Sequence, residues 1–213
     1  MAEASRGAPA PVPCGPPRRA YVDRRNIRGM WALSTSEGGS AYHHGDLRRG
    51  LIAAAHELLE AGGVEAVTLR EAARHAGVSH NAPYRHFASR EALLAALTTE
   101  GFQALRRALE EAGSEAGPTG RLEALGRAYL RFADRDRATF RLMFGGVIER
   151  AGHPDLAEAA AAAFGALRSV VAEREPSDRA EREALRAWAL VHGLAHLVAD
   201  RQIDAAQAEA CLT

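Results

Sequence analysis

Between Thr68 and Phe87 the sequence concentrates side chains that can exchange hydrogen bonds with the edges of nucleic acid bases. These polar residues are Ser79, His80, Asn81, Tyr84, Arg85 and His86. An asparagine amide can pair bidentately with adenine, and an arginine guanidinium can do so with guanine. Thr68 and Ser79 stand at expected helix starts, where backbone N–H groups and the helix dipole attract phosphates. The stretch therefore carries donors and acceptors suited to a nucleic acid duplex.

Two short helices are expected to position these side chains. Thr68 and Glu71 have the spacing of a capping box, which predicts the start of a helix that ends before Gly77. Ser79 is the expected N-cap of a second helix that runs to about Phe87. Glycine in the turn can take a positive φ that other residues resist. This spacing is that of a helix-turn-helix, whose second helix enters a major groove.

Helical periodicity continues on both sides of the helix-turn-helix. A first helix is expected from Asp46, with its stop at Gly62-Gly63, and a long helix should begin at Ser89. Further helices are expected over 121–134, 136–150, 155–174 and 178–200, with a loop at 113–120 and a short tail helix after Ile203. No alternating strand pattern appears between the breakers, so the predicted fold class is all-α.

The segments YHHGDLRRGLIAAAHELLEAGG and VTLREAARHAGVSHNAPYRHFASREALLAAL resemble the DNA-binding domain of the tetracycline-repressor (TetR) family. The likeness covers Tyr42 to Gln103. It implies a three-helix helix-turn-helix domain at 41–103, joined by a long helix to an α-helical effector-binding and dimerisation domain at 104–213. The expected function is a transcriptional regulator, most often a repressor, that binds a palindromic operator in double-stranded DNA as a homodimer and leaves it when a small apolar effector binds.

The resemblance also implies roles for single residues. By position, Thr68, Tyr84 and Arg90 would clamp phosphates. The residues on or beside the face that reads the bases would be Ser79, His80, Asn81, Ala82, Arg85 and His86. Phe87 matches a family phenylalanine that packs inward.

Two departures from the family pattern lie in this segment. Asn81 and Pro83 stand where the family usually has glycine and a β-branched or apolar residue, and Arg90 replaces a lysine. Arg90 keeps the positive charge. Pro83 removes the first intrahelical hydrogen bond, so the recognition helix is expected to start irregularly.

The segment LRAWALVHGLAHLVA at 185–199 is apolar nearly all round. Such a helix must be covered on every side, with its own core on one face and a symmetry mate on the other. We expect a homodimer through the helix at 178–200 and the tail helix, which would place two recognition helices about 34 Å apart. Trp188, His192 and Gly193, with FRLMFGG at 140–146, resemble the WHG regulatory domain of some TetR-like proteins.

Large apolar side chains concentrate in the C-terminal half and could line a cavity for an apolar effector. The candidate effector-binding residues are Phe132, Phe140, Met143, Phe144, Phe164, Trp188 and His192. Core packing explains the same residues about as well as a cavity does.

Two other functions can be weighed against the regulator. His192 and His196 have the spacing of metal ligands on one helix face, but no third ligand, Gly-rich phosphate loop or nucleophile elbow is evident, so we expect no enzyme, metal or cofactor. A helical interaction module that lost DNA binding is the other alternative. Pro83 favours it, and so does the charge balance of residues 41–98, which hold six arginines and six acidic residues.

Bulk properties place further bounds on the 213-residue chain, whose formal net charge is zero. Cys14 and Cys211 lie near opposite ends with no metal-binding pattern, and no apolar run reaches the roughly 20 residues of a membrane span. We therefore expect a cytoplasmic protein. Residues 1–40 are rich in proline and arginine and should be disordered, as a basic arm that touches DNA or as an artefact of start-site choice with Met30 as initiator.

Overall fold

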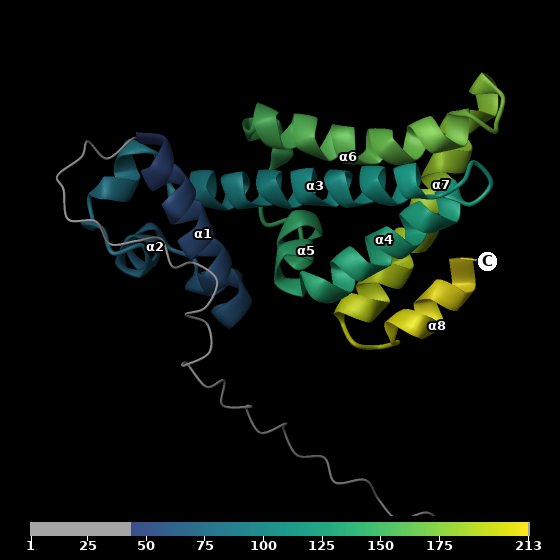
Figure 1. The fold of residues 1–213 in the computed structure, drawn as a ribbon. Coiled ribbons are helices and arrows are strands. Elements are labelled where there is room, and N and C mark those ends of the chain that lie inside the picture. Colours follow the sequence, from purple (N-terminus) through teal and green to yellow (C-terminus); the bar gives the residue numbers. More distant parts are fainter. Residues whose placement is uncertain (1–43, 213) are drawn as a thin grey trace, which may run out of the picture. The chain divides into compact units, whose positions relative to one another are not determined.

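The computed structural model describes residues 44–212, and every regular element in this range is helical (Figure 1). The all-α prediction is therefore confirmed for the described part of the chain. The expected N-terminal arm at 1–40, including Met30, lies outside the described residues.

The N-terminal helices enclose a small core of their own. They are α1 (His44–Gly62), α2 (Leu69–His75) and the first half of α3 (Arg90–Glu115). Leu51, Leu59 and Leu93 are fully buried between them. Gly63, with φ of 72°, directly follows α1, in agreement with the expected stop at Gly62-Gly63.

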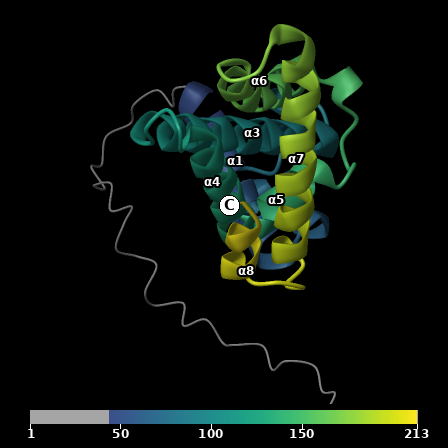
Figure 2. The ribbon, with the colours of Figure 1, turned by 90° about the vertical axis from the view of Figure 1, so that its right-hand side faces the viewer.

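The C-terminal helices pack around the second half of α3. They are α4 (Arg121–Arg135), α5 (Arg137–Phe144), α6 (Pro154–Ala172), α7 (Ser177–Ala199) and α8 (Ala205–Glu209). Figure 1 shows α6 lying along α3, and Figure 2 shows α7 crossing α4 and α6. A second core lies among these helices and includes Phe102, Leu130 and Leu156.

Two expected boundaries of the helices are wrong. α3 continues through Gly113 to Glu115, because the Gly113 position packs against Leu125 of α4 and the tertiary contact outweighs the low helix propensity of glycine. α5 ends at Phe144 rather than near 150, because Gly145 follows it directly and Gly146 takes φ of 69°.

Helix α5 contributes side chains to both cores. Leu142 is buried in the N-terminal core, whereas Phe140 and Met143 belong to the C-terminal one. α5 crosses α3 at Gly101, where a methyl group on the glycine would approach the Met143 sulfur to 2.8 Å and Thr139 Cγ2 to 2.9 Å. The two cores thus meet at one close helix crossing. The predicted domain division at 103/104 falls inside the continuous helix α3 and stays a prediction.

Candidate DNA-binding surface and effector cavity

The recognition segment, residues 79–87, is less regular than the sequence predicted. Its only helical turn is η2 (Ala82–Arg85), a 3₁₀ turn, so Ser79 does not cap an α-helix and that prediction is wrong. Pro83 has no N–H to donate and is buried, while its carbonyl accepts hydrogen bonds from the backbone N–H groups of His86 and Phe87 at 2.9 Å. The irregular start expected from Pro83 is present.

The recognition segment presents a polar outer side and an apolar inner side. The exposed residues of the predicted set are Ser79, His80, Asn81, Tyr84 and Arg85. Tyr84 is 59% exposed, whereas Phe87 is 3% exposed and packs inward as predicted. Ala82 and His86 are half-buried. The exposed side therefore holds a phenol, an amide and a guanidinium within a few residues, which can bind phosphates and base edges.

Helix α2 and the turn behind it hold the recognition segment in place. The Thr68 hydroxyl accepts a hydrogen bond from the Glu71 backbone N–H at 3.1 Å, which confirms Thr68 as the N-cap. The other half of the predicted capping box is wrong, because the Glu71 carboxylate pairs with Arg74 at 2.7 Å instead. Gly77 takes φ of 68°, and the Val78 N–H bonds to the Ala73 carbonyl at 3.0 Å. This Schellman ending fixes the direction of the turn.

Arg90, a predicted phosphate clamp, already has partners inside the protein. Its Nε donates to the Val67 carbonyl at 2.7 Å, and a terminal nitrogen donates to the Val64 carbonyl at 2.6 Å. The side chain is 40% exposed, and a terminal nitrogen also lies 3.8 Å from a carboxylate oxygen of Glu65. Arg90 thereby ties the start of α3 to the loop before α2. Its phosphate contact stays a prediction.

The C-terminal core contains a cavity of about 550 Å³ bounded by α3, α4, α6 and α7. Of the predicted effector-binding residues, Phe144, Phe164 and Trp188 line it. Phe132, Phe140, Met143 and His192 do not. Phe140 and Met143 are buried core residues, and Phe132 lies next to two other hollows. The periodicity of the sequence could not distinguish wall from core, because both are apolar positions on the same helices.

His192 lies behind the cavity wall in a chain of polar contacts. The hydroxyl of Tyr129, a cavity-lining residue, is 2.9 Å from His192 Nδ1, and His192 Nε2 is 3.2 Å from His196 Nε2. Burial, with a further contribution from His196, lowers the pKa of His192 to about 4. Burial raises the pKa of Tyr129. His192 is therefore neutral at neutral pH and can accept a hydrogen bond on one ring nitrogen.

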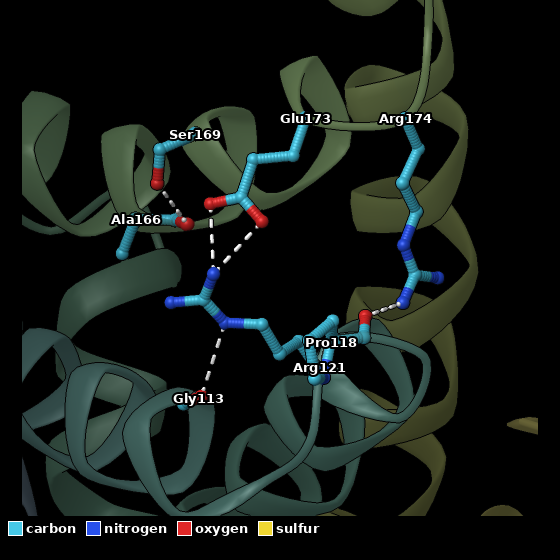
Figure 3. A network of polar contacts seen from close by, with 7 residues as sticks. All are labelled: Gly113, Pro118, Arg121, Ala166, Ser169, Glu173 and Arg174. Atoms are coloured by element: carbon cyan, nitrogen blue, oxygen red, sulfur yellow. Dashed lines mark hydrogen bonds and ion pairs between the residues drawn. The ribbon is translucent and has the colours of Figure 1, made fainter.

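A polar network joins the α3–α4 loop to the end of α6 and includes Arg174 of the cavity wall (Figure 3). Arg121 donates to both carboxylate oxygens of Glu173 at 2.8 Å and to the Gly113 carbonyl at 3.1 Å. Arg174, which follows α6, donates to the Pro118 carbonyl. These contacts hold the α3–α4 loop against the end of α6.

The cavity wall also contains three charged residues that were not predicted from the sequence, namely Glu123, Arg150 and Arg174. Arg150 and Arg174 flank α6 at its two ends. The Arg150 guanidinium lies over the ring of Phe102, 5.2 Å from its centroid. Nothing in the local sequence around 150 distinguishes this arginine from a solvated one, so only the tertiary structure could find it.

Helix α7 is buried on one face only. Val191, Ala195 and Val198 face the core, while Leu185, Leu190 and Leu197 are 53%, 52% and 39% exposed. Around Gly193, on the exposed face, a methyl group would meet no atom within 4 Å. The helix that was predicted to be covered on every side therefore leaves an apolar face open in the single chain.

Two further features concern residues 44–212 only. No group of three or more His, Cys, Asp or Glu side chains in this range could hold a metal ion. None of the helices in the same range is both long and apolar enough to span a membrane.

Two sequence families match the chain. "Bacterial regulatory proteins, tetR family" matches residues 51–97, and "Tetracyclin repressor-like, C-terminal domain" matches residues 122–212. Comparison with curated proteins found no matching sequence.

Solved structures share the whole fold. A Rhodococcus sp. RHA1 protein described as having unknown function is 40% identical with a TM-score of 0.71, over 82% of this chain and 93% of that one. The TetR family regulator PfmR from Thermus thermophilus is 22% identical with a TM-score of 0.57, over 76% and 94%. A tetR family regulatory protein from Rhodococcus RHA1 is 22% identical with a TM-score of 0.56, over 78% and 96%.

A helix-turn-helix with an exposed polar segment, joined by one long helix to a helical domain with its own cavity, defines a DNA-binding transcriptional regulator. The two family matches cover both of these parts. The chain belongs to the TetR family of bacterial regulators. The WHG subtype of its C-terminal domain stays a prediction.

Proposed function

We propose that the protein is a ligand-responsive repressor that acts in the cytoplasm and binds a palindromic operator as a homodimer. The observation that carries this proposal is the exposed side of residues 79–85, backed by the buried Pro83 and Phe87. Tyr84, Thr68 and Arg90 contact phosphates and set the register. Asn81 and Arg85 carry the pairing chemistry that discriminates bases.

The open face of α7 supports the homodimer. A single chain leaves Leu185 and Leu197 exposed on either side of Gly193, and burying such a face against its own copy forms an isologous contact. The absence of a side chain at Gly193 lets two α7 helices approach closely. Two recognition segments on one dimer can then occupy successive major grooves.

Coupling between cavity and DNA runs through α5. Phe144 lines the cavity and contacts the His192 ring at a centroid distance of 4.5 Å, while Leu142 on the same helix is buried in the N-terminal core. An effector that pushes Phe144 outward shifts α5 and, with it, the N-terminal core. The effector thereby favours the dimer whose recognition segments no longer match the grooves.

Retardation of labelled promoter fragments by the purified full chain tests this function. We expect the protein to retard a palindromic fragment from near its own gene. We expect Tyr84→Ala to weaken binding about tenfold on every sequence tested, since a phosphate contact carries no base information. Val147→Ala removes an exposed apolar side chain elsewhere (47% exposed) and serves as the matched control.

Salt dependence separates a regulator from a module that lost DNA binding. Phosphate contacts by arginine make the affinity fall steeply as the salt concentration rises. No retardation of any promoter fragment at low salt would overturn the proposal and favour the interaction module.

A further inference from the structure

The cavity in the C-terminal core is elongated along α6. Its wall on that helix extends from Ala157 to Leu167, which at about 1.5 Å per residue is a length of roughly 15 Å. Between these ends Ala160, Ala161 and Ala163 line the cavity, and their small side chains leave the space open. A volume of about 550 Å³ distributed over that length favours a narrow, extended occupant over a compact one.

The charges of the wall are not equivalent. Glu123 pairs with Arg127 of the same helix, so its charge is compensated. Arg174 donates to the Pro118 carbonyl, near the Arg121–Glu173 pair. Among the described residues, no carboxylate pairs with Arg150.

Arg150 is placed to bind a group inside the cavity. Its guanidinium lies over the Phe102 ring, and this ring and Phe144 are parts of the cavity wall, with ring centroids 5.3 Å apart. A guanidinium that lies over an aromatic face still has N–H groups in its own plane, where a carboxylate or phosphate can accept two of them. The positive charge and the apolar walls therefore line the same cavity.

We propose that the cavity binds an extended apolar molecule that ends in an anionic group. Its hydrocarbon part lies along α6, and its anionic group binds Arg150. The chemical class is an aliphatic carboxylate or phosphate monoester. This refines the effector of the proposed repressor from a neutral apolar molecule to an amphipathic acid. Release from DNA by this ligand rests on the proposed function, whereas binding in the cavity does not.

Tryptophan fluorescence can measure this binding directly. The sequence holds two tryptophans, so Trp31→Phe leaves Trp188 of the cavity wall as the only one. The probes are dodecanoate, dodecyl phosphate, dodecanol and methyl dodecanoate, each below its aggregation limit. We expect saturable changes with the two anions and at least about tenfold weaker binding of the neutral alcohol and ester, since a charge-assisted pair is lost. The stronger anion identifies the head group.

Arg150→Gln in the same background tests the anion contact. It should weaken binding of the preferred anion about tenfold and leave the alcohol unchanged, whereas Arg106→Gln, on the solvent side of α3, should change neither. Equal affinities for anions and neutral probes, or an anion affinity unaffected by Arg150→Gln, would overturn the inference. Absence of any binding would overturn it as well.

The same protein samples distinguish failure of the proposed anion binding from failure of the proposed repressor function. Retardation of the operator fragment without added probe reports DNA binding alone. A protein that retards DNA but shows no preference for anions keeps the proposed function and loses the inference. A protein that prefers anions through Arg150 and retards no fragment does the reverse.

Discussion

Tyr84 and Arg85 are neighbours in η2 and both are exposed, yet their loss should have different consequences. A phenol hydroxyl on a phosphate supports binding to every sequence, whereas a guanidinium on a base edge supports binding to one. A test of these two residues must therefore compare affinities for several operator sequences and not for one operator alone.

Replacing Arg85 with alanine should relax specificity. We expect the best operator to lose about 1–3 kcal/mol of binding free energy and the discrimination at one base pair per half-site to disappear. Fluorescence anisotropy against a set of single-base operator variants measures both. Arg106→Ala, on an exposed position of α3, is the control. If Arg85→Ala weakened all variants equally, Arg85 would contact the backbone instead.

His192 should make the folded state sensitive to acid. Its pKa of about 4 in the fold lies below the ordinary 6.5, so the unfolded chain takes up more protons between these values. The contribution to stability is complete above pH 6.5 and is lost as the pH falls towards 4. We expect the unfolding free energy of His192→Gln, measured by denaturant titration at pH 7 and pH 5, to fall less than that of the wild type. An equal fall in both proteins would contradict this.

At the scale of elements, the crossing of α3 and α5 joins the two cores. Gly101 has no side chain at the point where Thr139 and Met143 approach, so the spacing of the helices depends on it. The crossing also links the cavity to the helix-turn-helix, because α5 has buried residues in both cores.

Gly101→Ala should therefore destabilise the protein. The added methyl group would lie 2.9 Å from Thr139 Cγ2, and overpacking of this kind typically costs about 1–3 kcal/mol. Gly50→Ala on α1 is a matched control, because nothing lies within 4 Å of the new atom and the gain in helix propensity should stabilise by about 0.5–1 kcal/mol. Denaturant unfolding of both variants provides the measurement. If Gly101→Ala and Gly50→Ala changed the unfolding free energy equally, the helix crossing would have room to relax.

For the whole molecule, the proposed homodimer makes the open face of α7 the contact that would let the protein span two grooves. Leu197→Arg places like charges near the two-fold axis of the proposed dimer, and we expect a monomer with strongly reduced affinity for the operator. Sedimentation velocity and anisotropy on the same samples test this. Val147→Arg, an equally exposed apolar position outside α7, should remain dimeric. If the Leu197→Arg variant remained dimeric, the interface would lie elsewhere on the protein.

The helical fold, the Thr68 cap, the Gly77 turn and the inward packing of Phe87 could all be predicted from the sequence. The first three depend on local chemistry, namely apolar residues at helical spacing, a hydroxyl next to free N–H groups and a positive φ, whereas Phe87 was expected inside from the family resemblance. The family followed from the same stretch, because its motif residues are contiguous.

Contacts between distant segments define which apolar residues line the cavity, where the charges of its wall lie and which face of α7 is open. Phe140 and Phe144 are one helical turn apart, yet one is core and the other wall. Arg90 and Arg150 are both arginines near helix starts, but one bonds to carbonyls and the other lies over an aromatic ring. Such differences depend on neighbours distant in the sequence, and periodicity along one helix carries no information about them.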